Sequence, residues 1–153
     1  MPKIDLDKVP QRSGSSYPDQ YSADTATRTW LPVAEHAGLT QFGANLVSLV
    51  PGAKSSLRHW HAKEDEFLIV TEGTPTLIED DGETLLHPGD CAAFKAGVEN
   101  GHHLVNTTDQ MAKFLVVGTS HPEEICTYSD IDMKVTDKDG ESTFTRKDGT
   151  PID

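Results

Sequence analysis

The stretch RHWHAKEDEF, residues 58–67, decides how the rest of the chain is interpreted. His59 and His61 flank one tryptophan, and Glu66 follows after a short polar segment. Side chains at positions i and i+2 of a β-strand point to the same face, so the two histidines point together if this segment is a strand. A turn at residues 62–65 then predicts a hairpin that returns Glu66 beside them from an adjacent strand. Two imidazoles and one carboxylate suit a borderline divalent metal ion.

The surrounding chain reads as a succession of short strands. From Asn45 to about residue 119, apolar runs of about four to eight residues alternate with gaps that carry Gly, Pro, Asp or Asn. Asp81-Gly82 has the composition of a tight hairpin turn. This spacing predicts an all-β, antiparallel sandwich or barrel. One short helix is predicted near residues 121–126, where His-Pro-Glu-Glu resembles a helix start.

Length and charge limit the classes of protein. The chain has 153 residues, which is enough for one domain with one main core. A formal net charge of -12 argues against nucleic acid or an anionic membrane as a partner. The sequence has no apolar run of about twenty residues and no signal-like N-terminus. Cys91 and Cys126 form no disulfide framework, so we expect a cytoplasmic protein with reduced thiols, bacterial in style.

A fourth ligand is expected from another part of the sheet. His102 and His103 begin the strand-like run HHLVN, and either imidazole could reach the site, because strand parity alone does not choose between them.

At this point the sequence resembles the cupin superfamily. The first cupin motif is matched at every fixed position, and the second begins with Gly-Asp and ends with a histidine and an asparagine. The matching residues are Gly52, His59, His61, Glu66 and Gly73 in the first motif and Gly89, Asp90, Gly97, His102 and Asn106 in the second. Lys95 replaces the usual proline, the loop from Gly97 to His102 is two residues longer than usual, and the spacer after Gly52 is one residue longer.

The resemblance implies a cupin-type antiparallel β-barrel, also described as a double-stranded β-helix or jelly-roll-like fold. The spacing to Asn106 in the second motif selects His102 as the fourth ligand. The resemblance thus implies one divalent transition metal per chain (Mn, Fe, Ni, Zn or similar), held by His59, His61, Glu66 and His102. Within the superfamily, the sequence most resembles small single-domain bacterial cupins, some of which are named sugar-phosphate isomerase or auxin-binding-like protein. Members of this kind are commonly homodimers.

The chain divides into three segments. Residues 1–27 are predicted to form an N-terminal arm, residues 28–128 the cupin barrel, and residues 129–153 a C-terminal arm or tail. The composition of the last segment allows two alternatives, a flexible tail or an ordered arm anchored by apolar side chains.

Several reactions suit this set of ligands. The first hypothesis is an enzyme that acts on a small polar carbonyl or hydroxy compound, a sugar derivative or an organic acid, by metal-assisted isomerase, lyase or dioxygenase chemistry. The alternatives are a cupin that binds or senses a small molecule without catalysis, and a structural cupin without turnover. No residue is assigned as the catalytic base.

Five further side chains receive expectations. Glu64 and Asp65 are predicted to be exposed turn residues. Cys91 is expected to be a small buried side chain, because its strand is apolar. Lys95, at the mouth of the barrel, is a candidate to contact an anion, although a solvated lysine is the simpler alternative. His103 is expected to lie outside the barrel or at a subunit contact.

Overall fold

Strict alternation along strand β5 (Glu66–Glu72) builds the centre of the core. Leu68 and Val70 are each 1% exposed and point inward, whereas Phe67 points outward. Strand β10 (Ala112–Thr119) runs antiparallel to β5 and places Phe114 opposite Val70. Burial of one face fixes this register, because a shift by one residue would turn every apolar side chain to solvent.

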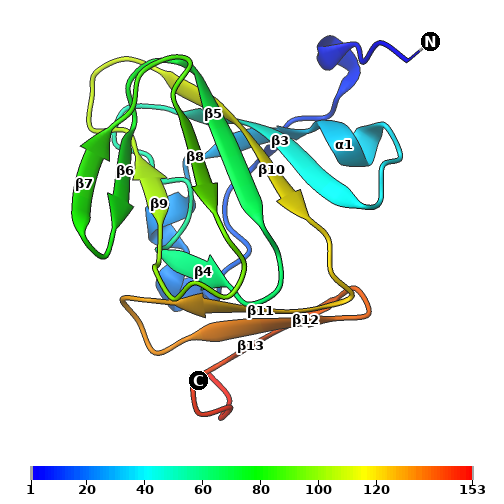
Figure 1. Ribbon diagram of the computed structural model, residues 1–153, viewed down its shortest axis with the longest axis vertical. Helices are drawn as coiled ribbons and strands as arrows, with labels where there is room; N and C mark the ends of the chain where they lie inside the picture. The colour runs from blue at the N-terminus through cyan, green and yellow to red at the C-terminus, as the bar shows by residue number, and fades with distance from the viewer. Residues whose placement is uncertain (1, 153) are drawn as a thin grey trace.

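The computed structural model describes residues 2–152 and confirms the all-β, antiparallel class predicted from sequence (Figure 1). The remaining strands are β1 (Arg12–Ser13), β2 (Thr29–Pro32), β3 (Phe42–Leu49), β4 (His59–His61), β6 (Thr76–Glu79), β7 (Gly82–Leu85), β8 (Cys91–Phe94), β9 (His103–Val105), β11 (Glu123–Tyr128), β12 (Lys134–Lys138) and β13 (Glu141–Thr145). The helices are the short 3-10 turns η1 (Leu6–Lys8), η2 (Asp19–Tyr21) and η3 (Ala23–Thr25) and helix α1 (Val33–His36). Within residues 2–152 there is no helix of the length and apolar character that a bilayer crossing requires.

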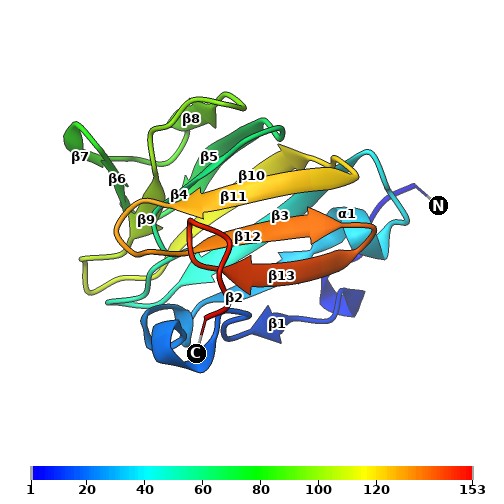
Figure 2. The same cartoon turned by 90° about the horizontal axis from the view of Figure 1, so that it is seen from below.

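The strands form three sheets. One has six strands in the order β1-β2-β3-β10-β5-β8, one has three in the order β7-β6-β9, and one has four in the order β13-β12-β11-β4. Figure 1 shows the four-stranded sheet lying across one end of the molecule, and Figure 2, seen from that end, shows β11, β12 and β13 side by side. The main core contains residues from the six-stranded and three-stranded sheets, including Leu49, Leu68, Leu77, Leu104 and Phe114.

The predicted hairpin between β4 and β5 does not form. β4 pairs with β11, which places His59 opposite Tyr128 and His61 opposite Cys126, whereas β5 pairs with β10 and β8. The predicted helix near residues 121–126 is also wrong, because β11 occupies that segment. Strand pairing on both edges of β11, with β4 and β12, outweighs the local helix-start signal. Residues 62–65 therefore carry the chain from one sheet to another.

Both flanking segments pack against the barrel. Within residues 129–153, β12 and β13 extend the four-stranded sheet, and Met133 is fully buried, so most of this segment is ordered. In the N-terminal segment, Tyr17 packs edge-on against Tyr128 with 5.4 Å between ring centroids. Together these residues build a second core beneath the strand that carries the two histidines.

The prediction of a buried Cys91 is wrong. Cys91 is exposed because β8 is the edge strand of its sheet and its side chain faces outward, whereas Ala92 and Phe94 are partly buried against the core. The apolar run in β8 therefore reports burial of only one face.

Candidate metal centre

The four predicted ligands meet where the three sheets join. His59 and His61 lie on β4, Glu66 begins β5, and His102 directly precedes β9. His59 and His102 exchange two backbone hydrogen bonds, from His59 N to His102 O at 3.2 Å and from His102 N to His59 O at 2.9 Å. These two hydrogen bonds hold the side chains of His59 and His102 next to each other, and they bring the histidine of the second motif to those of the first.

The distances within the group are short. His102 Nε2 lies 2.9 Å from Glu66 Oε1, and His61 Nε2 lies 3.2 Å from Glu66 Oε2. The ring centroid of His59 is 4.9 Å from the ring centroid of His61 and 4.9 Å from that of His102. The structure thus brings together all four residues that the sequence singled out, with His102 rather than His103 beside Glu66.

His59, Glu66 and His102 each offer a donor atom within 4.8 Å of the others, as one divalent ion requires, and His61 adjoins this group through Glu66. Both ring nitrogens of His61, and Nδ1 of His102, are buried and have no hydrogen-bond partner among residues 2–152. Two ligands that bind one ion at about 2.1 Å and at right angles lie about 3 Å apart, close to the separations of Glu66 from His61 and His102. Three imidazoles and one carboxylate are also the donor chemistry of Mn, Fe, Ni or Zn sites.

The protonation states of two of the four residues, His59 and Glu66, favour the same interpretation. Burial lowers the pKa of His59 to about 4, so its imidazole is neutral at neutral pH. Burial opposes ionisation of Glu66, but the hydrogen bond from His102 and the close imidazole of His61 outweigh it and hold the pKa of Glu66 well below its usual range. His59 Nδ1 lies 2.8 Å from Leu57 O, so it carries the proton and leaves Nε2 as a free lone pair. A neutral imidazole and an ionised carboxylate are the forms that bind metal.

Two supporting residues were missed by the sequence analysis. The ring of Phe94 stacks on His102, with centroids 3.5 Å apart and an angle of 4° between planes, which restricts rotation of the imidazole. Glu124 is 1% exposed and accepts hydrogen bonds from the backbone N–H groups of Ala62 and Lys63, at 2.8 and 3.1 Å. It therefore fixes the chain directly after His61. No local pattern marks Glu124, because its partners lie about sixty residues away in sequence.

The two turn carboxylates differ from each other. Asp65 is exposed, as predicted, and accepts a hydrogen bond from Ala96 N at 2.8 Å. Glu64 is not fully exposed, because its side chain keeps 24% of its accessible surface and lies 4.0 Å from His61 Nδ1. Glu64 is thus a neighbour of the candidate centre rather than a solvated turn residue.

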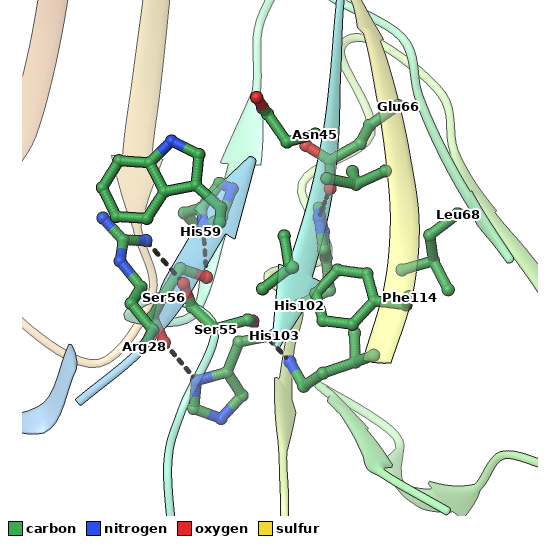
Figure 3. Close-up of a pocket in the computed structure, with 14 residues that line it drawn as sticks. Arg28, Asn45, Ser55, Ser56, His59, Glu66, Leu68, His102, His103 and Phe114 are labelled. Atoms are coloured by element: carbon green, nitrogen blue, oxygen red, sulfur yellow. Dashed lines mark hydrogen bonds and ion pairs between the residues drawn. The ribbon is translucent and has the colours of Figure 1, made fainter. Parts of the chain in front are cut away.

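A cavity of about 310 Å³ adjoins His59, Glu66 and His102. Figure 3 shows His59, Glu66 and His102 on its walls, with Phe114 and Leu68 among the apolar lining. His103 also contributes to the cavity lining, and its Nδ1 lies 2.7 Å from Ser56 O. Arg28, which the sequence analysis did not single out, lines it too. Lys95, the proposed anion contact, instead lines two other pockets, one of which is also lined by His61 and His102.

Known structures share this fold. The chain is similar to a protein from Acidithiobacillus ferrooxidans named provisionally as a sugar phosphate isomerase, with 23% identity, a TM-score of 0.76, and coverage of 83% of this chain and 81% of that chain. It is also similar to the polyketide cyclase RemF from Streptomyces resistomycificus, with 22% identity, a TM-score of 0.63, and coverage of 79% and 80%. No curated protein matches the chain significantly.

Two further comparisons identify the family. The family model of the cupin domain matches residues 45–118, which include both motifs. A crystal structure described as a sugar phosphate isomerase of the cupin superfamily, from Silicibacter pomeroyi, is 53% identical, with a TM-score of 0.97 and coverage of 99% of this chain and 97% of that chain. The chain therefore belongs to the cupin superfamily.

Proposed function

We propose that this cupin is a metal-dependent enzyme that isomerises a small phosphorylated sugar. The observation that carries the proposal is the group of His59, Glu66 and His102, which lies beside a cavity large enough for a compact polar molecule, with His61 on the far oxygen of Glu66. The 53% identity to a protein described as a sugar phosphate isomerase supports isomerase chemistry over the lyase and dioxygenase alternatives.

The four side chains have a common role in this proposal. His59, His61, Glu66 and His102 would hold one divalent cation, which when bound polarises a carbonyl or hydroxyl oxygen of the substrate. Burial of these donors keeps bulk water away from the reacting atoms. The apolar walls, which include Leu68 and Phe114, exclude water from the same space.

An isomerase also needs a group that moves a proton, and we assign this role to His103. Its Nδ1 lies 2.7 Å from Ser56 O, and a carbonyl oxygen can only accept, so Nδ1 carries the hydrogen. Nε2 is then the unprotonated nitrogen of a residue that contributes to the cavity lining. It is the imidazole outside the ligand group that can accept a proton from a bound sugar.

Metal analysis tests the first part of the proposal. Protein purified without chelator should contain close to one divalent ion per chain, and His59→Ala and His61→Ala should lose it. His87→Ala is the matched control, because His87 is an exposed histidine paired with Asp90 away from the cavity. Retention of metal by both ligand variants would refute the proposed centre.

Turnover tests the second part. Metal-loaded protein should interconvert an aldose phosphate and its ketose phosphate in a panel of three- to six-carbon sugar phosphates. His103→Gln should lower kcat by about 100-fold or more with metal content unchanged, which is the usual contribution of a positioned acid or base. Tight binding of panel members without turnover would instead indicate a cupin that binds a small molecule.

A further inference from the structure

The cavity beside the candidate metal centre contains a second polar feature, Arg28. This residue directly precedes β2 and is half-buried. Its Nε donates to Gly14 O at 3.0 Å and its Nη1 donates to Ser55 O at 2.6 Å, while the guanidinium lies over Trp30 at 5.0 Å from the ring centroid. These contacts hold Arg28 at the cavity wall through Nε and Nη1, and neither of the two hydrogen bonds uses Nη2.

The positive charge of Arg28 has no counter-ion in the part of the chain that the structure describes. No carboxylate of residues 2–152 lies within 4.0 Å of it, although the chain contains 25 acidic residues and only 13 lysines and arginines. Arg12 and Arg58, by contrast, each pair with acidic side chains. Burial lowers the pKa of Arg28, but a guanidinium stays protonated in proteins. Partial burial of an unpaired cation is costly, and a bound anion would offset this cost.

The location of Arg28 relates it to the candidate metal centre. Figure 3 shows Arg28 on the other side of the cavity from Glu66 and Phe114, and the same cavity is lined by His59 and His102. A ligand that fills the cavity can thus present one end to the guanidinium and the other to the ligand group. A guanidinium binds the planar or tetrahedral oxygens of carboxylate and phosphate through paired hydrogen bonds.

We propose that Arg28 binds the anionic group, phosphate or carboxylate, of the molecule that occupies this cavity. The proposal rests on the proposed function for the nature of the ligand and adds to it the residue that anchors the non-reacting end. Arg28 thereby selects anionic sugars and acids over neutral ones and orients their reactive end toward the histidines. Lys95, the candidate from sequence, does not line this cavity.

Binding of inorganic phosphate tests the proposal without any turnover. The chain has two tryptophans, so two indole N–H signals are expected in a nitrogen-15 NMR spectrum, and Trp30→Phe assigns them. Phosphate should shift the Trp30 signal saturably and leave the Trp60 signal in place, because only Trp30 lines the cavity with Arg28. A parallel titration with acetate shows whether carboxylates are accepted as well as phosphate.

Variants identify the group responsible. Arg28→Gln should weaken the phosphate response at least tenfold, and Arg28→Lys, which keeps the charge but not the planar fork, should fall between it and the parent protein. Arg12→Gln removes the same charge from an exposed pair with Glu35 and should leave the response unchanged. If Arg28→Gln fails to fold, Asn45→Asp provides the test, because it adds a negative charge to the same cavity and should weaken phosphate binding.

The outcomes separate this inference from the proposed function. Unchanged phosphate affinity in Arg28→Gln, or in Asn45→Asp where that variant is used, would overturn the anion site and leave metal binding and isomerase activity unaffected. A phosphate response that depends on Arg28, in a protein with no isomerase activity, would overturn the proposed reaction and support the anion site.

Discussion

Gly73 directly follows β5, and its replacement by alanine should destabilise the protein through a backbone clash. Its φ is +72°, and a Cβ built there would collide with the carbonyl oxygen of Met111 and lie 2.9 Å from the Cα of Ala112. Gly52, the other glycine of the first motif, has φ +84° and no atom within 4 Å of the position that a Cβ would take. Comparing Gly73→Ala with Gly52→Ala therefore separates the cost of backbone strain, which both variants have, from the cost of the packing clash, which only Gly73→Ala has.

The expected magnitudes follow from these two surroundings. An L-residue in the left-handed region costs about 1–2 kcal/mol, and alanine recovers about 0.4–1 kcal/mol by restricting the unfolded chain. Gly52→Ala should thus cost about 1 kcal/mol. Overpacking against backbone atoms adds about 1–3 kcal/mol, so Gly73→Ala should cost about 3 kcal/mol. For a chain of this size, the difference of about 2 kcal/mol corresponds to about 4–8 °C in Tm.

Urea unfolding followed by tryptophan fluorescence, at fixed metal content, measures both free energies of unfolding. Equal destabilisation by the two substitutions, within about 0.5 kcal/mol, would refute the reasoning. It would mean that β10 moves away from the added methyl group at no cost, so the close approach of β5 and β10 would not require glycine.

Three further outcomes are expected. Arg58, whose side chain is 13% exposed, donates to two aspartates and a backbone carbonyl. In urea unfolding, Arg58→Met should therefore lower the free energy of unfolding by about 1–2 kcal/mol. Arg12→Met, which removes an exposed ion pair, should change it by less than about 0.5 kcal/mol. A thiol reagent should modify one cysteine per native chain and two after unfolding, because Cys91 is exposed and burial raises the pKa of the Cys126 thiol; two fast-reacting native thiols would contradict this. Sedimentation velocity at micromolar concentration should give a homodimer, and a monomer would contradict that expectation.

Local signals in the sequence were sufficient for much of the fold. The Asp-Gly signal at residues 81–82 corresponds to the β6–β7 hairpin, in which Glu79 pairs with Gly82. Alternation in EFLIVTE correctly gave the inward face of β5. Both features depend on residues within a few positions of each other, so short-range steric preferences and burial of one face determine them.

Long-range pairing was not predictable from the same signals. The strand that carries His59 and His61 pairs with β11, more than sixty residues later, rather than with the next strand in sequence. Glu124 and Arg28 were missed for the same reason, since each acquires its environment only when distant segments meet. The four candidate ligands were found because they fit a family motif, which records a three-dimensional arrangement that their spacing alone does not specify.

The location of the candidate centre links metal binding to the stability of the whole barrel. His59 and His61 belong to the four-stranded sheet, Glu66 belongs to the six-stranded sheet, and His102 adjoins the three-stranded sheet. An ion bound by all four would connect three sheets that otherwise meet through backbone bridges and side-chain packing. Binding to the folded state alone adds about 2.7 kcal/mol to stability at a free metal concentration one hundred times the Kd. Loss of a single ligand should therefore weaken both metal affinity and the junction between the sheets, because the same four contacts determine both.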